Sequence, residues 1–352
     1  MEYIFKDVLD VKNGKNQREV ECPDGQYPIY GSGGVMGYAS DYICEADTVI
    51  IGRKGSINNP IYAEEPFWNV DTAFGLCAKK DILLPKYLFY FCIKFDFERL
   101  NRTVTIPSLT KSDLLKIKIQ VPSLDVQQEV IDKLTKIESI LNFRKQELKL
   151  LDELVRGRFV ELFGDPVSNS YGLPELGVFG RGVSKHRPRN DPKLLGGDYP
   201  LIQTGDIANA GLYITSYNST YSEFGLKQSK MWEKGTLCIT IAANIAKTAI
   251  LEFDACFPDS VVGFTANERT NNIFIHYWFS FFQAILESQA PESAQKNINL
   301  KILSELKVIV PEKERQNEFA NFVHRIDKSK FRGLSMLTTI KSAYDQQTFI
   351  YP

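Results

Sequence analysis

The sequence predicts an α/β (α+β) fold with an internal duplication, in which two similar domains are separated by two long antiparallel helices that form an intramolecular coiled coil. Three observations predict this fold. Apolar residues recur at heptad spacing over one long stretch, the opening of that stretch recurs about 189 residues later, and shorter motifs recur at almost the same offset. The predicted segments are a first domain at 1–122, a central helix at 123–164, a second domain at 165–311 and a C-terminal helix at 312–352.

The composition is typical of a soluble protein with a substantial core. The chain has 352 residues, of which 43% are hydrophobic, and a formal net charge of -1. No apolar run reaches the roughly 18 residues of a membrane span, and the opening MEYIFKDVLDVK has no signal-peptide pattern. We therefore expect a cytoplasmic protein with no membrane partner. The six cysteines are scattered, without a CxxC pair or nearby histidines, so we expect reduced thiols and no metal site.

The central helix covers VPSLDVQQEVIDKLTKIESILNFRKQELKLLDELVRGRFVELF, residues 121–163. Its apolar residues step by alternate fours and threes, broken only by Arg144 and Arg158, with charges between them. That spacing is typical of a seam packed against another helix. The glycine and proline of FGDP, residues 163–166, are expected to end the helix. The seam predicted for the two helices consists of Val130, Leu134, Ile137, Leu141, Leu148, Leu151, Val155, Phe319, Val323, Ile326, Leu337, Ile340 and Tyr344.

The partner of the central helix lies in the same chain. VPEKERQNEFANFVHRIDKSK, residues 310–330, matches the opening of the central helix at an offset of 189, which aligns Gln316 with Gln127. The chain therefore contains both helices of the pair. Gly333 and the neighbouring threonines Thr338 and Thr339 lower helix propensity, so we expect the second helix to be the less stable one.

The two predicted domains share several motifs. The matched pairs are DTVIIG (47–52) with GTLCIT (235–240), NVDTAFGLCAKK (69–80) with FPDSVVGFTANE (257–268), YLFYF (87–91) with IHYWF (275–279), and SLTKSDLLKIKIQVP (108–122) with NINLKILSELKVIVP (297–311). Only the loops near the amino end of each domain diverge strongly in length and residue type. A shared scaffold with different loops favours two related but non-identical recognition surfaces.

Elements of the first domain can be predicted directly. The β-branched run Thr48–Ile51 predicts a buried strand, and residues 73–79 predict a second one. Residues 85–100 are apolar over too long a stretch for a strand with a solvent face, so they predict a buried helix. The loop that follows the first strand contains Arg53, Lys54, Ser56, Asn58 and Asn59.

Motifs for catalysis are missing. Asn59-Pro60-Ile61-Tyr62 is similar to the adenine-positioning loop of methyltransferases, but it lacks the second proline and leaves no room upstream for a cofactor-binding sheet. Pro23-Asp24 and Pro258-Asp259 lack the acidic-x-Lys tripeptide of metal-dependent nucleases. We therefore expect no catalytic residue, no cofactor and no enzymatic activity in this chain alone. Three histidines far apart in sequence are interpreted as packing or surface residues: His186, His276 and His324.

Residues suited to nucleic-acid binding gather in loops. RGVSKHRPRNDPK, residues 181–193, combines basic side chains with one acid, Asp191. Lysine and arginine hold phosphates, arginine reaches guanine, and asparagine or glutamine reaches adenine. Residues 203–206 follow the strand-like YPLI, and residues 243–247 lie opposite 53–58 through the repeat. The candidate DNA contacts are Arg53, Lys54, Ser56 and Asn58 in the first domain, and Lys185, Arg187, Arg189, Asn190, Gln203, Thr204, Asn244 and Lys247 in the second.

Two other functional classes stay open at this point. The nearly neutral charge favours a scaffold whose coiled coil joins protein partners without DNA specificity, whereas the basic segment 181–193 disfavours it. An enzyme that acts on DNA by itself would require activity from the purified chain with S-adenosylmethionine or magnesium and no partner.

Two groups of motifs point to one known family. LLDELVRGRFVELFGDP and the duplicated VPxxxxQxE lie at the helices, and KHRPRNDP, YPLIQTGDI and GTLCITIAANIAKTAILEFDACFPDSVVGF lie in the second domain. With these motifs the chain resembles, over nearly its whole length, the specificity subunit of bacterial type I restriction–modification systems. The resemblance implies that each domain is a target recognition domain that reads one half of a split double-stranded DNA sequence.

The same resemblance implies the partners. Two modification subunits would dock around the helices and domains and transfer a methyl group from S-adenosylmethionine to adenine N6. Restriction subunits would join them and cleave DNA remotely with ATP, so S-adenosylmethionine, ATP and magnesium would belong to those partners and not to this chain. A helix of about 40 residues is about 60 Å long. We therefore expect the helix pair to set the distance between the two half-sites.

Overall fold

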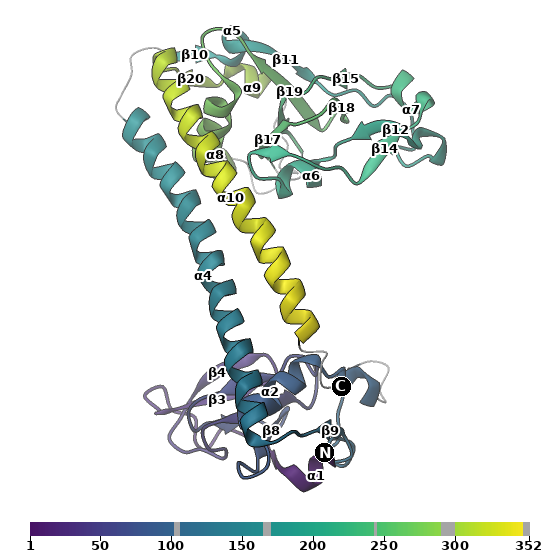
Figure 1. Cartoon of the computed structure of the whole chain (residues 1–352). Coiled ribbons are helices and arrows are strands. Elements are labelled where there is room, and N and C mark those ends of the chain that lie inside the picture. The colour runs from purple at the N-terminus through teal and green to yellow at the C-terminus, as the bar shows by residue number, and fades with distance from the viewer. Residues whose placement is uncertain (102–105, 165–169, 243–244, 290–299, 348–352) are drawn as a thin grey trace. The chain divides into compact units, whose positions relative to one another are not determined.

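The chain forms two compact units, each with its own sheets and core. The computed structural model describes residues 1–101, 106–164, 170–242, 245–289 and 300–347. One unit comprises Met1–Glu147 with Gly333–Pro352, and the other comprises Leu148–Arg332. Both long helices, α4 (Leu124–Phe163) and α10 (Lys313–Gln347), are divided between the units (Figure 1). The limits predicted from the sequence treat each helix instead as a separate segment.

The first unit contains a four-stranded sheet, a three-stranded sheet and a two-stranded ribbon. The first sheet has the order β2-β8-β5-β6 and is antiparallel; the second has the order β4-β3-β7, with β3 and β7 parallel. The ribbon pairs β1 with β9. The strands are β1 (Glu2–Ile4), β2 (Leu9–Asn13), β3 (Tyr27–Gly31), β4 (Gly34–Ala39), β5 (Thr48–Gly52), β6 (Ile61–Ala63), β7 (Trp68–Asn69), β8 (Ala73–Ala78) and β9 (Lys118–Gln120).

Strand β5 and helix α2 (Pro85–Lys94) organise the core of the first unit. All residues of β5 are buried, which confirms the buried strand predicted from its β-branched run. Helix α2 confirms the first part of the buried helix predicted at 85–100, which ends at Lys94 and is followed by a separate 3-10 helix at Phe97–Leu100. The proline of α2 stands in its first turn, where no backbone donor is lost. Leu134 of α4 is buried in the same core, so the long helix is anchored there. The short helices are α1 (Phe5–Val8), η1 (Phe97–Leu100) and α3 (Lys111–Leu114).

The second unit repeats this plan with more strands. A five-stranded sheet has the order β11-β19-β16-β17-β13, a four-stranded sheet has the order β14-β12-β18-β15, and β10 pairs with β20. The strands are β10 (Ser170–Gly172), β11 (Gly177–Arg181), β12 (Leu195–Leu201), β13 (Tyr213–Ile214), β14 (Ser219–Tyr221), β15 (Met231–Trp232), β16 (Leu237–Thr240), β17 (Thr248–Leu251), β18 (Ala255–Cys256), β19 (Val261–Ala266) and β20 (Lys307–Ile309).

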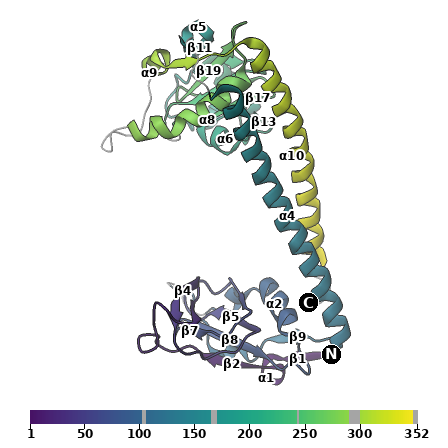
Figure 2. The same ribbon diagram turned by 90° about the vertical axis from the view of Figure 1, so that its left-hand side faces the viewer.

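Aromatic side chains join the long helices to the second unit. Phe159 of α4 stacks on Phe274 of α8 (Asn272–Gln289) at a centroid distance of 5.6 Å and meets Phe319 of α10 edge-on at 5.3 Å. Figure 2 shows α8 beside both long helices in this unit. Burying one such side chain contributes about 1.5–3 kcal/mol. The remaining helices are α5 (Leu173–Leu176), η2 (Pro192–Leu194), α6 (Thr204–Asn209), α7 (Glu223–Lys227) and α9 (Leu300–Glu305).

Strand registers confirm the duplication. Val49 of β5 faces Leu76 of β8, and the residues 188 positions later, Leu237 of β16 and Phe264 of β19, face each other in the same way. Val49 also faces Tyr62, as Leu237 faces Ile250. The two units therefore share not only a strand order but the pairing of individual residues.

The two units differ in the segment that follows β3 in the first unit and β12 in the second. β3 pairs in parallel with β7, and β12 pairs in parallel with β18. In the first unit a turn at Ser32 and Gly33 leads directly into β4, the antiparallel neighbour of β3. In the second unit α6 and β13 come before β14, the antiparallel neighbour of β12. This is the divergence of loop length that the sequence predicts.

In the first unit the two long helices run antiparallel. Tyr344 of α10 donates a hydrogen bond to Glu138 of α4 at 2.9 Å, and farther along α4 the Arg144 guanidinium lies 3.6 Å from the sulfur of Met336. Arg144, which interrupts the heptads in the sequence, thus contacts the facing helix.

In the second unit the helices are again antiparallel. Lys330 pairs with Asp152, and Arg158 pairs with Glu318 at 2.5 Å. Arg158 is the other residue that interrupts the heptads, and it too bridges the helices. A long polar side chain can cover the seam with its stem while its charged end reaches an acid on the neighbouring helix.

Each predicted seam residue occupies a buried or half-buried position, with Leu134, Val155, Phe319 and Val323 buried. Helix α4 ends at Phe163, next to the predicted stop at FGDP, whose Asp165 and Pro166 lie outside the described residues. A Cβ on Gly164 would lie 2.5 Å from the Val160 carbonyl oxygen, so glycine suits this end.

Candidate nucleic-acid interface

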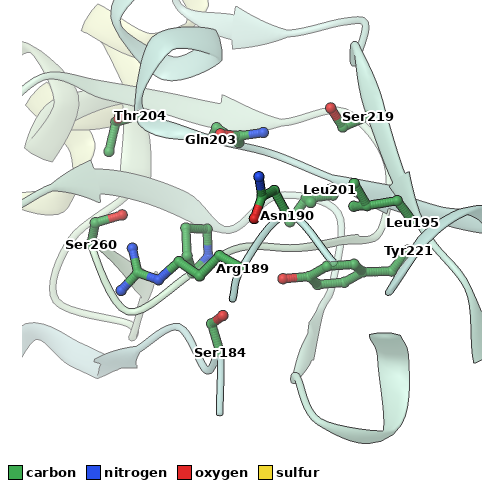
Figure 3. Close-up of a pocket in the computed structure, with 11 residues that line it drawn as sticks. Ser184, Arg189, Asn190, Leu195, Leu201, Gln203, Thr204, Ser219, Tyr221 and Ser260 are labelled. Atoms are coloured by element: carbon green, nitrogen blue, oxygen red, sulfur yellow. The ribbon is translucent and has the colours of Figure 1, made fainter. Parts of the chain in front are cut away.

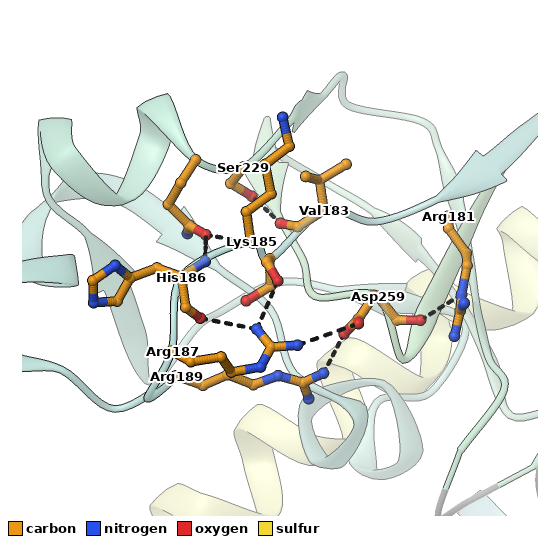
Figure 4. Close-up of polar contacts among 10 residues, drawn as sticks. Arg181, Val183, Lys185, His186, Arg187, Arg189, Ser229 and Asp259 are labelled. Atoms are coloured by element: carbon orange, nitrogen blue, oxygen red, sulfur yellow. Dashed lines mark hydrogen bonds and ion pairs between the residues drawn. The ribbon is translucent and has the colours of Figure 1, made fainter.

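In the second unit, the basic segment after β11 converges on Asp259. Arg181 donates from Nε to the Asp259 carbonyl oxygen at 2.8 Å. The Asp259 carboxylate pairs with Arg189 and lies 3.7 Å from Arg187 (Figure 4). One acid therefore gathers three arginines that the sequence separates from it by about 70 residues or more.

Internal hydrogen bonds fix the backbone of this segment. The Gln228 side-chain oxygen accepts from the backbone N–H groups of Lys185 and His186 at 2.7 and 3.0 Å. Asp191 accepts from the Lys193 backbone N–H at 3.0 Å and contacts the His186 ring at 2.8 Å. These two contacts, the backbone one first, lower the pKa of Asp191. The segment is thus an ordered loop that presents its side chains in fixed directions.

The arginines of the segment have different surroundings. Arg187 Nη1 donates to the carbonyl oxygens of Ser184 and His186 at 2.7 and 2.8 Å, so most of its guanidinium serves to hold the loop. Arg189 pairs with Asp259 and is one of the residues that line an open pocket (Figure 3). Arg189 is consequently the better placed of the two for contact with DNA.

The pocket has a volume of about 280 Å³ and lies wholly in the second unit. It brings together the basic segment, strands β12 and β14, the start of α6 and the loop before β19. Three of the predicted contacts, Asn190, Gln203 and Thr204, line it together with Arg189. Its lining consists of Ser184, Arg189, Asn190, Leu195, Leu201, Gln203, Thr204, Ser219, Tyr221, Pro258 and Ser260.

In the first unit the predicted loop follows β5. Gly55 has a φ of 83°, a left-handed conformation that favours glycine, and the turn leaves Arg53, Lys54 and Ser56 exposed. Arg53 donates to the Asp71 carbonyl oxygen at 3.4 Å. Because the repeat aligns Asp71 with Asp259, both units place an arginine on the carbonyl group of the same aspartate position.

Asn58 serves the fold of its own unit. Its amide nitrogen donates to Asp96 at 3.0 Å, and its oxygen accepts from the Phe97 backbone N–H at 2.7 Å. With both ends of the amide engaged, we leave Asn58 out of the proposed DNA contacts.

The corresponding loop of the second unit follows β16. The Ile241 backbone N–H bonds the Ser260 carbonyl oxygen at 3.0 Å, as that of Arg53 bonds Thr72 at 2.7 Å in the first unit. Lys247 is exposed, and its backbone is held by Thr240 at 3.0 Å. The predicted contact Asn244 lies outside the described residues.

Other predictions concern chemistry outside this interface. Burial lowers the pKa of His276 to about 4, and its ring contacts Thr248 at 2.9 Å, which confirms a packing role. All six cysteines are free thiols, as predicted. Among the described residues there is no cluster of histidine, cysteine, aspartate or glutamate that could hold a metal ion. In the same part of the chain, no helix is long and apolar enough to cross a membrane.

Sequence reasoning missed several residues of the interface. Asp259 was recognisable as a repeated position, but nothing local indicated its arginine partners. Ser184, Ser219 and Tyr221 carry no motif, and they reach the pocket from a loop and a strand that are separate in the sequence. Only the tertiary fold brings these residues together.

The chain matches one family model over both halves. The family is described as type I restriction modification DNA specificity domain, and the match covers residues 1–152 and 176–333. The chain belongs to this family. The predicted resemblance to specificity subunits is thereby confirmed.

The curated relatives of this chain are distant in sequence. This chain is 21% identical over 269 residues to a protein named as the type I restriction enzyme MjaX specificity subunit of Methanocaldococcus jannaschii, and the match covers 72% of this chain and 63% of that protein. It is 24% identical over 148 residues to the type I specificity subunit S.MpnORF285P of Mycoplasma pneumoniae, covering 40% of this chain and 48% of that one. The chain thus spans less than two thirds of the length of each.

Solved structures share the fold. The S subunit of a type I restriction–modification system from M. genitalium superposes with a TM-score of 0.69 and 17% identity, covering 100% of this chain and 96% of the other. A chain from a structure described as the basis of complex assembly and conformational transition of the type I R-M system superposes with a TM-score of 0.61 and 13% identity. The match covers 99% of this chain and 96% of the other. These similarities support the predicted arrangement of two similar domains and two long helices.

Proposed function

We propose that this chain is the sequence-recognition subunit of a type I restriction–modification complex, and that each of its domains reads one half of a bipartite double-stranded DNA site. The observation that carries the proposal is the placement of different exposed basic side chains in the loops at equivalent strand ends of a duplicated scaffold. Arg53 and Lys54 follow β5, and Lys247 lies in the loop after β16. Because the loops are placed equivalently, we expect both units to bind the same kind of ligand. Because their side chains differ, we expect each unit to read a different DNA sequence.

The charge distribution is consistent with this function. The net charge is -1, yet the segment 181–193 and the loop at Arg53 and Lys54 expose basic side chains. We propose that exposed lysines such as Lys185 and Lys247 hold phosphates while Arg189, Asn190, Gln203 and Thr204 face bases.

The helices are proposed to set the half-site spacing and to dock two modification subunits. Besides the seam they carry exposed apolar side chains, among them Phe143 and Phe331, which are 70% and 72% exposed. Catalysis would lie in the partners: methyl transfer with S-adenosylmethionine in the modification subunits, and ATP- and magnesium-dependent cleavage in restriction subunits. The complex would act on host DNA in the cytoplasm.

Salt dependence tests the proposal against a scaffold without DNA specificity. Several lysine or arginine contacts to phosphates release counterions, so we expect the affinity of the full chain for duplex DNA to fall about a hundredfold or more between 50 and 200 mM salt. Titration of a labelled duplex at increasing salt measures this.

Two variants make the salt test specific. Lys185→Ala is expected to reduce the slope of log affinity against log salt by about 1, since one phosphate contact is lost. Lys301→Ala, on α9, removes the same charge away from the interface and should leave the slope unchanged. DNA binding that is absent at low salt would contradict the proposed function.

A further inference from the structure

The pocket of the second unit contains hydrogen-bonding groups that the protein itself leaves unused. Within the described part of the chain, the side chains of Asn190, Ser219 and Ser260, which line the pocket, have no hydrogen-bond partner. Ser184 is more telling, because this residue is only 7% exposed and its hydroxyl group is buried with no partner. A buried hydroxyl group without a partner costs free energy, so its retention points to a ligand that supplies the missing bond.

The lining is unsuited to a phosphate. A phosphate group requires convergent positive charge, whereas the one guanidinium that lines the pocket, that of Arg189, is already paired with Asp259. The hydroxyl and amide groups of the pocket can both donate and accept, and Leu195 and Leu201 add an apolar surface (Figure 3). Mixed donors and acceptors beside apolar side chains match a planar heterocyclic base.

We propose that this pocket binds the hydrogen-bonding edge of one adenine in the half-site read by the second domain. The proposal rests on the function proposed above. The carboxamides of Asn190 and Gln203 are the side chains that pair with adenine N6 and N7 in a bidentate way. Ser184 and Tyr221, which also carry hydroxyl groups, are further residues that line the pocket.

The first unit provides an internal control, because it lacks the elements of this pocket. By the shared register of β3 and β12, Gly31 occupies the place of Gln203. The hairpin that follows exposes Val35 and Met36, at 52% and 63%, in place of the polar side chains of α6 and β14. Adenine reading through this pocket is therefore confined to one half-site.

Selection from a random pool of duplexes tests the inference with the full chain, either alone or in complex with modification subunits. The wild-type chain should enrich a bipartite sequence. Gln203→Leu and Asn190→Leu should each lose the preference for adenine at one position of one half-site by about tenfold and leave the other half-site unchanged. Asn209→Leu, an exposed amide at the far end of α6, is the matched control and should select as the wild type does.

Ser184→Ala separates ligand binding from a structural role. Removing an unsatisfied buried hydroxyl group should leave the melting temperature of the free chain unchanged or raise it, while affinity for the selected duplex falls several-fold. Unchanged affinity would overturn the proposal.

Modified duplexes test which base the pocket binds and whether that base stays stacked in the duplex. Replacing the adenine by 7-deazaadenine removes the N7 acceptor, which should weaken binding by the wild type but not by Gln203→Leu. A mismatch opposite this adenine should strengthen binding if the base leaves the stack and weaken it if the base is read in the duplex. If both leucine variants kept the preference for adenine, the proposal that this pocket binds adenine would be refuted. If the wild-type chain selected no sequence, the proposed function itself would be refuted.

Discussion

Asp259 shows how one residue can organise the candidate DNA-binding surface through its contacts with three arginines. Its carboxylate lies between Arg187 and Arg189, and its carbonyl group accepts from Arg181. The acid neutralises part of the local positive charge, which weakens attraction to any phosphate, and it restrains the guanidinium groups, which favours one geometry. If the proposed contacts are made, such a residue would lower affinity for DNA and increase discrimination between sequences.

Asp259→Asn is expected to raise affinity for non-cognate DNA and to lower the ratio of cognate to non-cognate binding, because the arginines gain net charge and lose their restraint. Thermal stability should change by less than about 1 kcal/mol, since these ion pairs are partly exposed. Competition binding with cognate and random duplexes measures the ratio. Glu305→Gln, on α9, changes the net charge equally and serves as the control. An unchanged ratio would show that the arginines do not read bases.

At the scale of elements, the repeated motif VPxxxxQxE fixes the amino end of each long helix to the unit in which that end lies. Gln127 has no exposed surface; it donates to the Ile82 and Pro122 carbonyl oxygens at 2.8 and 2.9 Å and accepts from the Leu84 N–H at 2.8 Å. Gln316 repeats this arrangement at α10, with the Pro311 carbonyl at 2.8 Å. The glutamine of this family motif thus forms buried hydrogen bonds that hold the start of each long helix against its domain; we call this arrangement the glutamine clamp.

Gln127→Leu should destabilise the first unit by about 3 kcal/mol, because it leaves a buried N–H and two carbonyl groups without partners. The neighbouring Gln128 is exposed and donates a hydrogen bond to Asp132 on the same helix, so Gln128→Leu should cost less than about 0.5 kcal/mol. Chemical denaturation of the full chain compares the two variants. Equal costs would mean that the clamp contributes nothing to stability.

At the scale of the whole molecule, α4 and α10 connect the duplicated units within one chain. Val155 and Phe319 belong to the core of the second unit, and Leu134 belongs to that of the first. These residues therefore anchor α4 in both domain cores and α10 in the core of the second unit. A change in helix length should consequently move a complete recognition domain and should not simply alter a linker.

A seven-residue insertion within 140–150 of α4, matched by seven residues near Met336 of α10, preserves the heptads and adds about 10 Å. We expect the two half-sites to move apart by about 3 base pairs while each keeps its sequence. Methylation-sensitive sequencing of DNA from cells that carry the variant measures the spacing. An unchanged spacing would contradict the role proposed for the helices.

Local patterns in the sequence determined the two helices, the duplication and the family. Heptads predict a seam because side-chain spacing along a helix is fixed by its geometry, and the offset of 188 to 189 predicts equivalent strands because related sequences fold alike. The buried strand β5 was predicted from its β-branched run, and helix α2 from the length of its apolar stretch.

The tertiary structure alone decided what the candidate residues do. Asn58 and Arg187 resemble DNA contacts in the sequence, yet their polar groups are largely occupied by partners in the fold. Ser184 has no motif, yet it lines the pocket and its buried hydroxyl group has no partner. The physical reason is that a hydrogen bond depends on where a partner distant in sequence is placed, and neither composition nor periodicity encodes that distance.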